Sequence, residues 1–216
     1  MVTVYATVPF ASFRKSYARS FAETYPLPPP ATVYGMLLSL VGERHRARHA
    51  GVRLALAFRR QPRIATALRK LSRYKYGVPS KQAKFGNSLD YIETLCGIEL
   101  LCHVDSSQEP ATRPRLEERV TRALERPETV TRTGVLCLGL SDDAIDDICL
   151  MDAPTGTWRC LRPSNGGDLE LPVWVDHVGS KDTRWQRYEL VEEQVYASPI
   201  PGDFLQIVEP GQQPFS

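Results

Sequence analysis

Cationic and aromatic side chains alternate along one short stretch near the start of this 216-residue chain. The members of that stretch, between residues 13 and 25, are Phe13, Arg14, Lys15, Tyr17, Arg19, Phe21 and Tyr25. Cations bind phosphates and ring faces stack on unstacked bases, so the combination is typical of single-stranded nucleic acid binding. Core packing is the alternative for the rings. We favour it for Phe13 and Phe21, and it is as good as stacking for Tyr17 and Tyr25.

A helix is predicted directly after a proline-rich turn that ends at Pro30. Proline suits the start of a helix because the first-turn N–H groups have no intrahelical partner. Those N–H groups and the hydroxyl of Thr32 are therefore predicted to bind a phosphate.

A second basic and aromatic group lies between residues 62 and 91. Its members are Arg73, Tyr74, Lys75, Tyr76, Lys81, Lys84 and Phe85. The cations are irregularly spaced among Gly77, Pro79 and Gly86, without a core pattern, which predicts a protruding loop or hairpin that becomes ordered on RNA or on a partner. A solvated loop is the alternative. Arg132, beside a glycine-flanked apolar run, is a further candidate RNA contact.

The net charge of +2 conceals a strong asymmetry. Residues 1–88 contain 16 Lys and Arg against two acids, a net charge of +14, whereas residues 89–216 carry −12. The asymmetry predicts a half that binds a polyanion and a half that faces solvent or a basic partner. A solvated surface with chance clustering is the alternative.

Metal, disulfide and membrane chemistry have little support. The five cysteines contain no Cys-x-x-Cys pair, which argues against zinc and disulfides. His45 and His49 lie one helical turn apart but among three arginines, so we interpret them as a basic helix end. No apolar run could span a bilayer, and no secretory signal begins the chain. We therefore expect a cytoplasmic protein without cofactor, metal or membrane contact.

The elements that must position these residues follow a recognisable order. The predicted strands and helices cover residues 2–8 (strand), 31–43 (helix), 52–58 (strand), 91–104 (strand), 112–126 (helix) and 134–139 (strand). This βαββαβ order predicts an α+β, ferredoxin-like domain, similar to the RNA recognition motif, over residues 1–150. The stretch at about 62–91 is predicted to be a loop or hairpin inserted into this domain. Residues 151–216 are predicted to form a small β-rich C-terminal extension.

Two motifs resemble one family of CRISPR-associated proteins. The first is PFASFRKSYARSFAETYPLPPPATVYGMLLSLVGE, from Pro9 to Glu43, and the second is RTGVLCLG, from Arg132 to Gly139. Together they resemble the fifth-numbered family of type I effector (Cascade) subunits, of the DevS or Myxococcus-like kind, in the repeat-associated (RAMP) superfamily. Leu140 departs from the acidic residue common in that family, so no role is assigned to it.

The resemblance implies a structural role. Subunits of this family cap one end of the effector complex and hold the 5′ handle of the crRNA. Their thumb, to which the resemblance assigns the insertion at about 62–91, is a hairpin that contacts the guide and the neighbouring backbone subunit. They pack near the large PAM-sensing subunit and the PAM-proximal end of the target DNA. Such complexes act in antiviral defence or in RNA-guided transposition.

Two other functions remain open. Some relatives are metal-independent endoribonucleases that process repeat RNA with a tyrosine and an adjacent Lys-His pair. This chain has Tyr34, but Cys102-His103 where the pair would be sought, so we favour a subunit that is not an enzyme. The remaining hypothesis is a protein-only interaction module that uses the acidic half.

Overall fold

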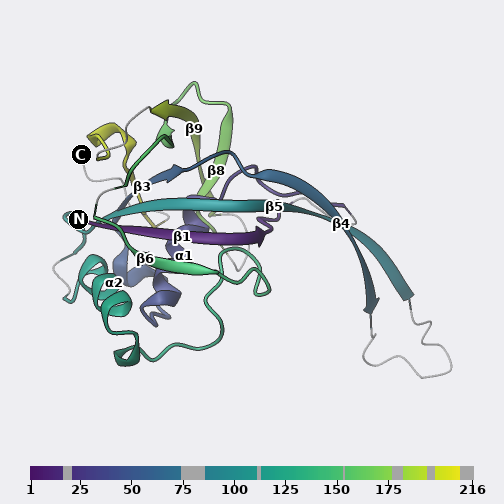
Figure 1. Ribbon diagram of the computed structural model, residues 1–216, viewed down its shortest axis with the longest axis horizontal. Coiled ribbons are helices and arrows are strands. Elements are labelled where there is room, and N and C mark those ends of the chain that lie inside the picture. The colour runs from purple at the N-terminus through teal and green to yellow at the C-terminus, as the bar shows by residue number, and fades with distance from the viewer. Residues whose placement is uncertain are drawn as a thin grey trace.

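The computed structural model describes residues 1–16, 21–73, 86–110, 113–152, 154–176, 182–193 and 198–209. These residues form one ten-stranded sheet and two α-helices (Figure 1). The predicted α+β class is confirmed.

Four adjacent strands of the sheet come from the first 150 residues of the chain. Their order is β6 (Asp147–Leu150), β1 (Val2–Ala11), β5 (Gly86–Asp105) and β3 (Arg53–Phe58), and each pairs antiparallel with its neighbour. Helix α1 (Pro30–Leu40) lies between β1 and β3 in the chain, and α2 (Leu116–Glu125) lies between β5 and β6. Side chains alternate along a strand, so one face of this sheet is buried beneath both helices.

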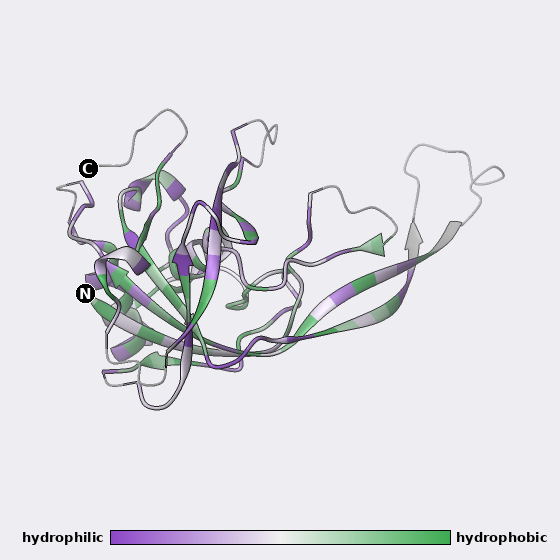
Figure 2. Cartoon of the chain, turned by 90° about the horizontal axis from the view of Figure 1, so that it is seen from above, coloured by the Kyte–Doolittle hydropathy of each residue, from purple (hydrophilic) through white to green (hydrophobic). Residues whose placement is uncertain are grey.

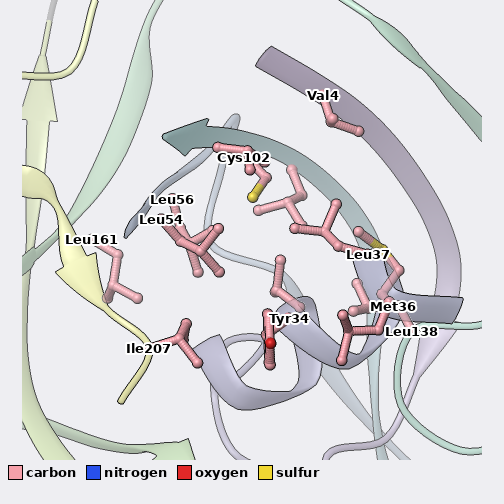
Figure 3. Packing of buried hydrophobic residues seen from close by; sticks show 14 of the residues in the cluster. Val4, Tyr34, Met36, Leu37, Leu54, Leu56, Cys102, Leu138, Leu161 and Ile207 are labelled. Carbon is pink, nitrogen blue, oxygen red and sulfur yellow. The ribbon is translucent and has the colours of Figure 1, made fainter. Parts of the chain in front are cut away.

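The main core lies between α1 and the sheet. Tyr34 and Leu37 of α1 pack with Leu54, Leu56 and Cys102 of β3 and β5, as Figure 3 shows. Eight of the eleven residues of α1 are buried, so packing rather than helix propensity holds this helix in place. In α2 the buried residues Leu116, Val120 and Ala123 recur at helical spacing and face the same core.

Helix α1 ends where the chain turns toward the loop at residues 130–133. The N–H of Glu43 donates to the carbonyl of Leu38 at 2.8 Å, and the N–H of Gly42 donates to Ser39 at 3.1 Å. This is a Schellman cap, which requires the left-handed φ of +68° that Gly42 adopts. A Cβ at Gly42 would lie 2.3 Å from the carbonyl oxygen of Thr131. Glycine is therefore needed both for the turn and for the close approach of the two segments.

Strands β4 (Arg63–Arg73) and β5 form a long antiparallel hairpin that extends away from the body (Figure 1). Arg63 pairs with Cys96 at its base and Arg73 with Gly86 at its far end. Figure 2 shows apolar and polar residues mixed along it. The described part of the predicted insertion at 62–91 is therefore paired strand, while the connection at 74–85 lies outside the described residues.

Strands after residue 150 extend the same sheet. Strand β7 (Trp158–Pro163) pairs with β3, followed by β9 (Arg184–Glu193) and the edge strand β8 (Leu169–Trp174). The short strand β10 (Leu205–Gln206) also pairs with β3, and β2 (Phe21–Ala22) pairs with β5. The regular structure of the described residues after 150 therefore consists mostly of strands.

Two predicted elements need correction. Residues 134–139 are not a strand; Cys137 forms only an isolated bridge to Ala144, and the strand beside β1 is β6, further along the chain. The positive φ of Gly134 and Gly139 explains the error, because such backbone does not continue a ladder. The second helix begins at Leu116 rather than at residue 112, since a proline at 114 disfavours helical backbone in the residue before it.

Candidate nucleic-acid interface

A groove runs along the outer side of α1, between that helix and the loop at residues 130–133. We call it the helix groove; its volume is about 460 Å³. The polar and small residues that line it are Ala31, Thr32, Gly35, Ser39, Gly42, Glu43, Arg44, Arg46, Thr131, Arg132, Thr133 and Gly139. Three arginines and several hydroxyl groups therefore face one channel, which is the donor set that binds phosphate oxygens.

Arg46 is held firmly on one wall of the helix groove. Its guanidinium lies 4.5 Å from the ring centroid of Trp174 and donates to the carbonyl of Val175 at 2.7 Å. Its own carbonyl accepts a 2.6 Å hydrogen bond from the Tyr34 hydroxyl. Burial lowers the pKa of Arg46 from its usual value, but the guanidinium stays charged at neutral pH. A cation fixed in this way loses little entropy when it binds an anion.

The loop that carries Arg44 and Arg46 is organised by a carboxylate. Glu43 Oε1 accepts the N–H groups of Arg44 at 3.0 Å and of His45 at 2.9 Å. Its Oε2 accepts a hydrogen bond from Nη1 of Arg119 at 2.5 Å. Burial alone raises the pKa of Glu43, but these bonds, with the charges of Arg119 and Arg48, lower it to about 2. Arg44 in turn donates to the hydroxyl of Thr133 at 3.1 Å and so spans the groove.

Arg119 connects this loop to a buried histidine. Besides Glu43 it donates to the Val41 carbonyl at 3.0 Å and to Nε2 of His49 at 2.9 Å. Because arginine can only donate, Nε2 of His49 is an acceptor, and Nδ1 donates to Glu109 at 2.8 Å. The network joins α1, α2 and the intervening loops, and it sets the position of one side of the helix groove.

Of the predicted RNA contacts, Thr32 and Arg132 meet in the helix groove, on its opposite walls. The start of α1 is a weaker anion site than predicted. Pro30 has no N–H, and the N–H groups of Thr32 and Val33 already donate to the Pro29 carbonyl. A phosphate in the groove would meet the Thr32 hydroxyl and arginines rather than an open helix terminus.

The N-terminal basic and aromatic stretch folds back on itself. The backbone N–H of Lys15 donates to the carbonyl of Glu23 at 3.0 Å, and the backbone N–H of Tyr25 donates to the carbonyl of Phe13 at 2.9 Å. Arg14 is exposed, whereas Lys15 forms an ion pair with Glu23 at 3.0 Å.

The rings of this stretch divide between core and surface. Phe13 and Tyr25 belong to the core, as favoured for Phe13, and Tyr25 is only 9% exposed. Tyr25 is thus a packing residue rather than an open stacking plane, because its ring packs in the main core. Phe21, expected in the core, is instead 44% exposed.

Most of the remaining predicted contacts lie outside the described residues. They are Tyr17, Arg19, Tyr74, Lys75, Tyr76, Lys81, Lys84 and Phe85. Arg73 ends strand β4, but its side chain is outside the described part of the chain.

Sequence reasoning missed three residues near these sites. Arg44 and Arg46 had been interpreted only as a basic helix end, although their density was the signal that could have placed them beside the helix. Trp185, on β9, is 42% exposed and its ring centroid lies 6.1 Å from that of Tyr25. Trp185 is a single tryptophan in a strand, so nothing in the local sequence indicated that it would be exposed beside Tyr25.

Tyr34 and His103, the residues considered for nuclease chemistry, lie on opposite faces of the sheet. Tyr34 packs with Cys102 in the main core, and alternation turns the next residue, His103, to the other side. His103 is 2% exposed, and burial lowers its pKa to about 4, despite the opposing effect of Asp203. Burial raises the pKa of Tyr34 above its usual value. The two groups are not arranged to act on one phosphate.

Metal and membrane sites were also considered. Among the described residues, no group of three His, Cys, Asp or Glu side chains is placed to hold a metal ion. None of the helices in the described part of the chain has the length and apolar character needed to cross a bilayer.

Comparison with solved structures assigns the fold to a class. The chain aligns with a TM-score of 0.59 and 14% identity to a chain of a CRISPR RNA-guided surveillance complex, over 90% of each. A structure described as a Cas protein aligns with a TM-score of 0.48 and 16% identity, over 91% of this chain and 94% of that one. The first of these alignments shows that the fold is one found in a CRISPR RNA-guided surveillance complex.

Sequence comparison gives the family. The chain is 40% identical over 201 residues to the CRISPR-associated protein Cas5 of Myxococcus xanthus (strain DK1622), covering 92% of this chain and 93% of the relative. No protein-family model matches the chain. The chain belongs to the Cas5 family of CRISPR-associated proteins.

Proposed function

We propose that this Cas5-family chain is an RNA-binding structural subunit of a type I CRISPR effector complex, in which it caps one end and holds the 5′ handle of the crRNA. The helix groove is the observation that carries the proposal. Arg44, Arg46 and Arg132 converge there with the hydroxyls of Thr32 and Thr133 in a channel of about 460 Å³. Its main acid, Glu43, is neutralised by Arg119 and Arg48, so the channel favours an anion.

The strand order supports a finer description of the fold. The order β6-β1-β5-β3, with α1 and α2 as the two crossovers, is that of a ferredoxin-like sheet. We interpret residues 1–150 as this RNA-binding domain, the β4–β5 hairpin as its thumb, and residues 151–216 as a β-rich extension. The extension shares the sheet and part of the core, since Leu161 and Tyr188 pack in the main cluster.

The hairpin supports a contact with another subunit. Five exposed apolar residues lie on one of its faces, which we call the hairpin apolar face: Phe21, Ile64, Leu68, Leu89 and Tyr91. Tyr91 of β5 lies between two of the others: the register pairs it with Leu68 of β4 on one side and with Phe21 of β2 on the other. Apolar stripes of this kind are typical of protein contacts.

The family resemblance identifies the neighbours that fit this role. The hairpin apolar face would contact the backbone subunit, and the body would lie near the large PAM-sensing subunit and the PAM-proximal target DNA. The role is the same in antiviral defence and in RNA-guided transposition, and in both it is exercised in the cytoplasm.

Endoribonuclease activity is the less favoured function, because Tyr34 and His103 are buried on opposite faces of the sheet. The check is incubation of the purified protein with RNA transcribed from its own repeat in the presence of EDTA. We expect intact RNA. Site-specific cleavage that disappears in His103→Ala or Tyr34→Phe would contradict the structural role.

Gly35 offers a direct test of the groove. It is exposed on α1, and a Cβ there would meet nothing within 4 Å, so a side chain can be added without steric conflict. Gly35→Glu places a negative charge among the three arginines, while Gly35→Gln adds the same bulk without charge. We expect the Glu variant to lose at least about tenfold in affinity for the repeat RNA, on the scale of one close charge pair, and the Gln variant to lose less. Equal affinity of both variants and the parent would overturn the proposal.

A further inference from the structure

A second cavity lies in the C-terminal part of the sheet, between strand β9 and the segment that contains β10. We call it the C-terminal pocket; its volume is about 390 Å³, within the range of small-molecule sites. Its chemically distinctive residues are Arg184, Trp185, Gln186, Tyr188, Phe204 and Gln206. None of them was a predicted RNA contact.

The walls of this pocket combine flat surfaces with hydrogen-bonding edges. Trp185 is 42% exposed and Phe204 is half-buried, with the guanidinium of Arg53 lying 5.1 Å from the Phe204 ring centroid. Gln186 and Gln206 carry amide groups. The Nε2 of Gln186 donates to the Arg187 carbonyl at 3.2 Å and that of Gln206 to the Gly51 carbonyl at 3.4 Å, and an amide has a second N–H and an oxygen that can also bond. Aromatic faces together with amide edges match an unstacked nucleobase, which has a π-face and a Watson–Crick edge. An aliphatic side chain of a protein partner would make no use of the amides.

One buried polar group of the pocket makes no hydrogen bond to the residues that the structure describes. The Tyr188 hydroxyl is buried, and among the described residues it makes no hydrogen bond. Burial raises the pKa of Tyr188, so the hydroxyl keeps its proton at neutral pH. A buried hydroxyl without a partner is unfavourable to folding, and such groups in native proteins tend to have a functional reason.

Trp185 links the C-terminal pocket to the N-terminal stretch. The same indole lines a neighbouring depression together with Lys15 and Tyr25. Asp168 and Glu170 also line that depression, and Lys15 is already paired with Glu23. This corner therefore repels phosphates more than the helix groove does, whereas an uncharged base is not repelled.

We propose that the C-terminal pocket receives one unstacked base of the bound RNA, with Trp185 as the stacking surface and with the glutamine amides and the Tyr188 hydroxyl as partners for the base edge. This inference rests on the proposed RNA-binding function, and it adds a site that recognises a base rather than the phosphates. It assigns to residues after 150 a direct part in reading the RNA.

The experiment uses the purified full chain and single-stranded RNA from its own repeat. Trp158 and Trp174 are 3% and 8% exposed, so quenching of tryptophan fluorescence by RNA that disappears in Trp185→Ala reports on Trp185, and the affinity of each variant is measured with labelled RNA. We expect quenching in the parent protein and about 5- to 150-fold weaker binding in Trp185→Ala, the range for loss of one stacked base. The matched control Trp185→Phe keeps a ring and should retain most of the affinity. The salt dependence should not change, because no phosphate contact is lost.

Tyr188→Phe separates the pocket from general stability. It removes a hydroxyl without a partner, so the free energy of unfolding should be unchanged or higher, while RNA binding weakens. The inference is overturned if Trp185→Ala and Tyr188→Phe both bind RNA like the parent. It is also overturned if they lose only association with partner subunits, which would make the pocket a protein site. Gly35→Glu decides the proposed function separately, since that substitution lies in the helix groove.

Discussion

The helix groove and the extended hairpin are built in opposite ways. In the groove, Arg46 and Arg44 are fixed by hydrogen bonds, and behind them Glu43, Arg119 and His49 form a largely buried network. In the hairpin, Leu68 and Leu89 are 57% and 58% exposed, and the described strands are held chiefly by the β4–β5 ladder. The groove is thus prepared before a ligand arrives, whereas the hairpin exposes apolar area that a partner can cover.

The difference separates two kinds of contact. Charges that are held in place bind phosphates with small loss of entropy and strong dependence on salt. An exposed apolar face binds by removal of surface from water, with weak dependence on salt. Substitutions in the buried network behind the groove should therefore change both folding and RNA binding. Substitutions of exposed groove residues should change RNA binding alone, and substitutions on the hairpin should change assembly alone.

The largest effect is expected at Arg119, which supports the groove from within α2. Arg119→Leu leaves Glu43 and His49 without their shared partner, and loss of one member of a buried charge pair typically costs about 3–5 kcal/mol. Denaturant unfolding measures this loss, and RNA affinity should fall with it. Arg122→Leu, at an exposed position of the same helix, is the control and should change stability by no more than about 0.5 kcal/mol. Similar losses in both variants would contradict the role of the network.

Acid should destabilise the protein in two pH windows, the upper one from His103 of β5 and the lower one from Glu43 of the groove network. Burial lowers the pKa of His103 to about 4 in the folded protein, against about 6.5 in the unfolded chain. The unfolded chain therefore binds the proton first, and stability falls as the pH drops from about 6.5 to 4. The pKa of Glu43 is about 2 against 4.5, so its contribution is present above 4.5 and is lost between about 4.5 and 2. Thermal unfolding against pH measures both. Glu43→Gln should remove only the lower window; an unchanged profile would argue against the carboxylate.

A smaller effect is expected at Arg132, on the opposite wall of the groove. Arg132 is exposed, so Arg132→Ala should leave stability within about 0.5 kcal/mol. If it contacts one phosphate, the slope of log K against log salt for single-stranded RNA should become shallower by about 0.7. Binding measured at several salt concentrations gives this slope. An unchanged slope would remove Arg132 from the RNA contact.

The smallest effect on the isolated chain is expected on the hairpin apolar face. Leu68→Lys changes a side chain that is 57% exposed, so the free energy of unfolding and the affinity for free RNA should stay close to the parent values. Co-purification with the backbone subunit should be lost, because a charge replaces buried apolar area at the contact. Ala67→Lys, at an exposed position on the opposite face of the same strand, is the matched control for added charge. Normal assembly of Leu68→Lys would assign the partner contact elsewhere.

The sequence by itself determined the order of the elements and the sign of the charge. The strand near Val4, the helix after Pro30 and the second amphipathic helix follow from local periodicity, which depends only on neighbouring residues. The +14 of residues 1–88 likewise needs no structure. The pattern misled at residues 134–139, because apolar runs do not reveal the left-handed glycines that interrupt pairing.

The tertiary structure alone decided which residues meet. Arg132 and Arg44 lie far apart in the chain, and only the close approach at Gly42 brings them to the walls of one groove. Burial turned Tyr25 into a packing residue and left Trp185 open, although both are aromatic residues near polar neighbours. Local periodicity cannot specify such contacts, because they depend on the distance between segments that are remote in sequence.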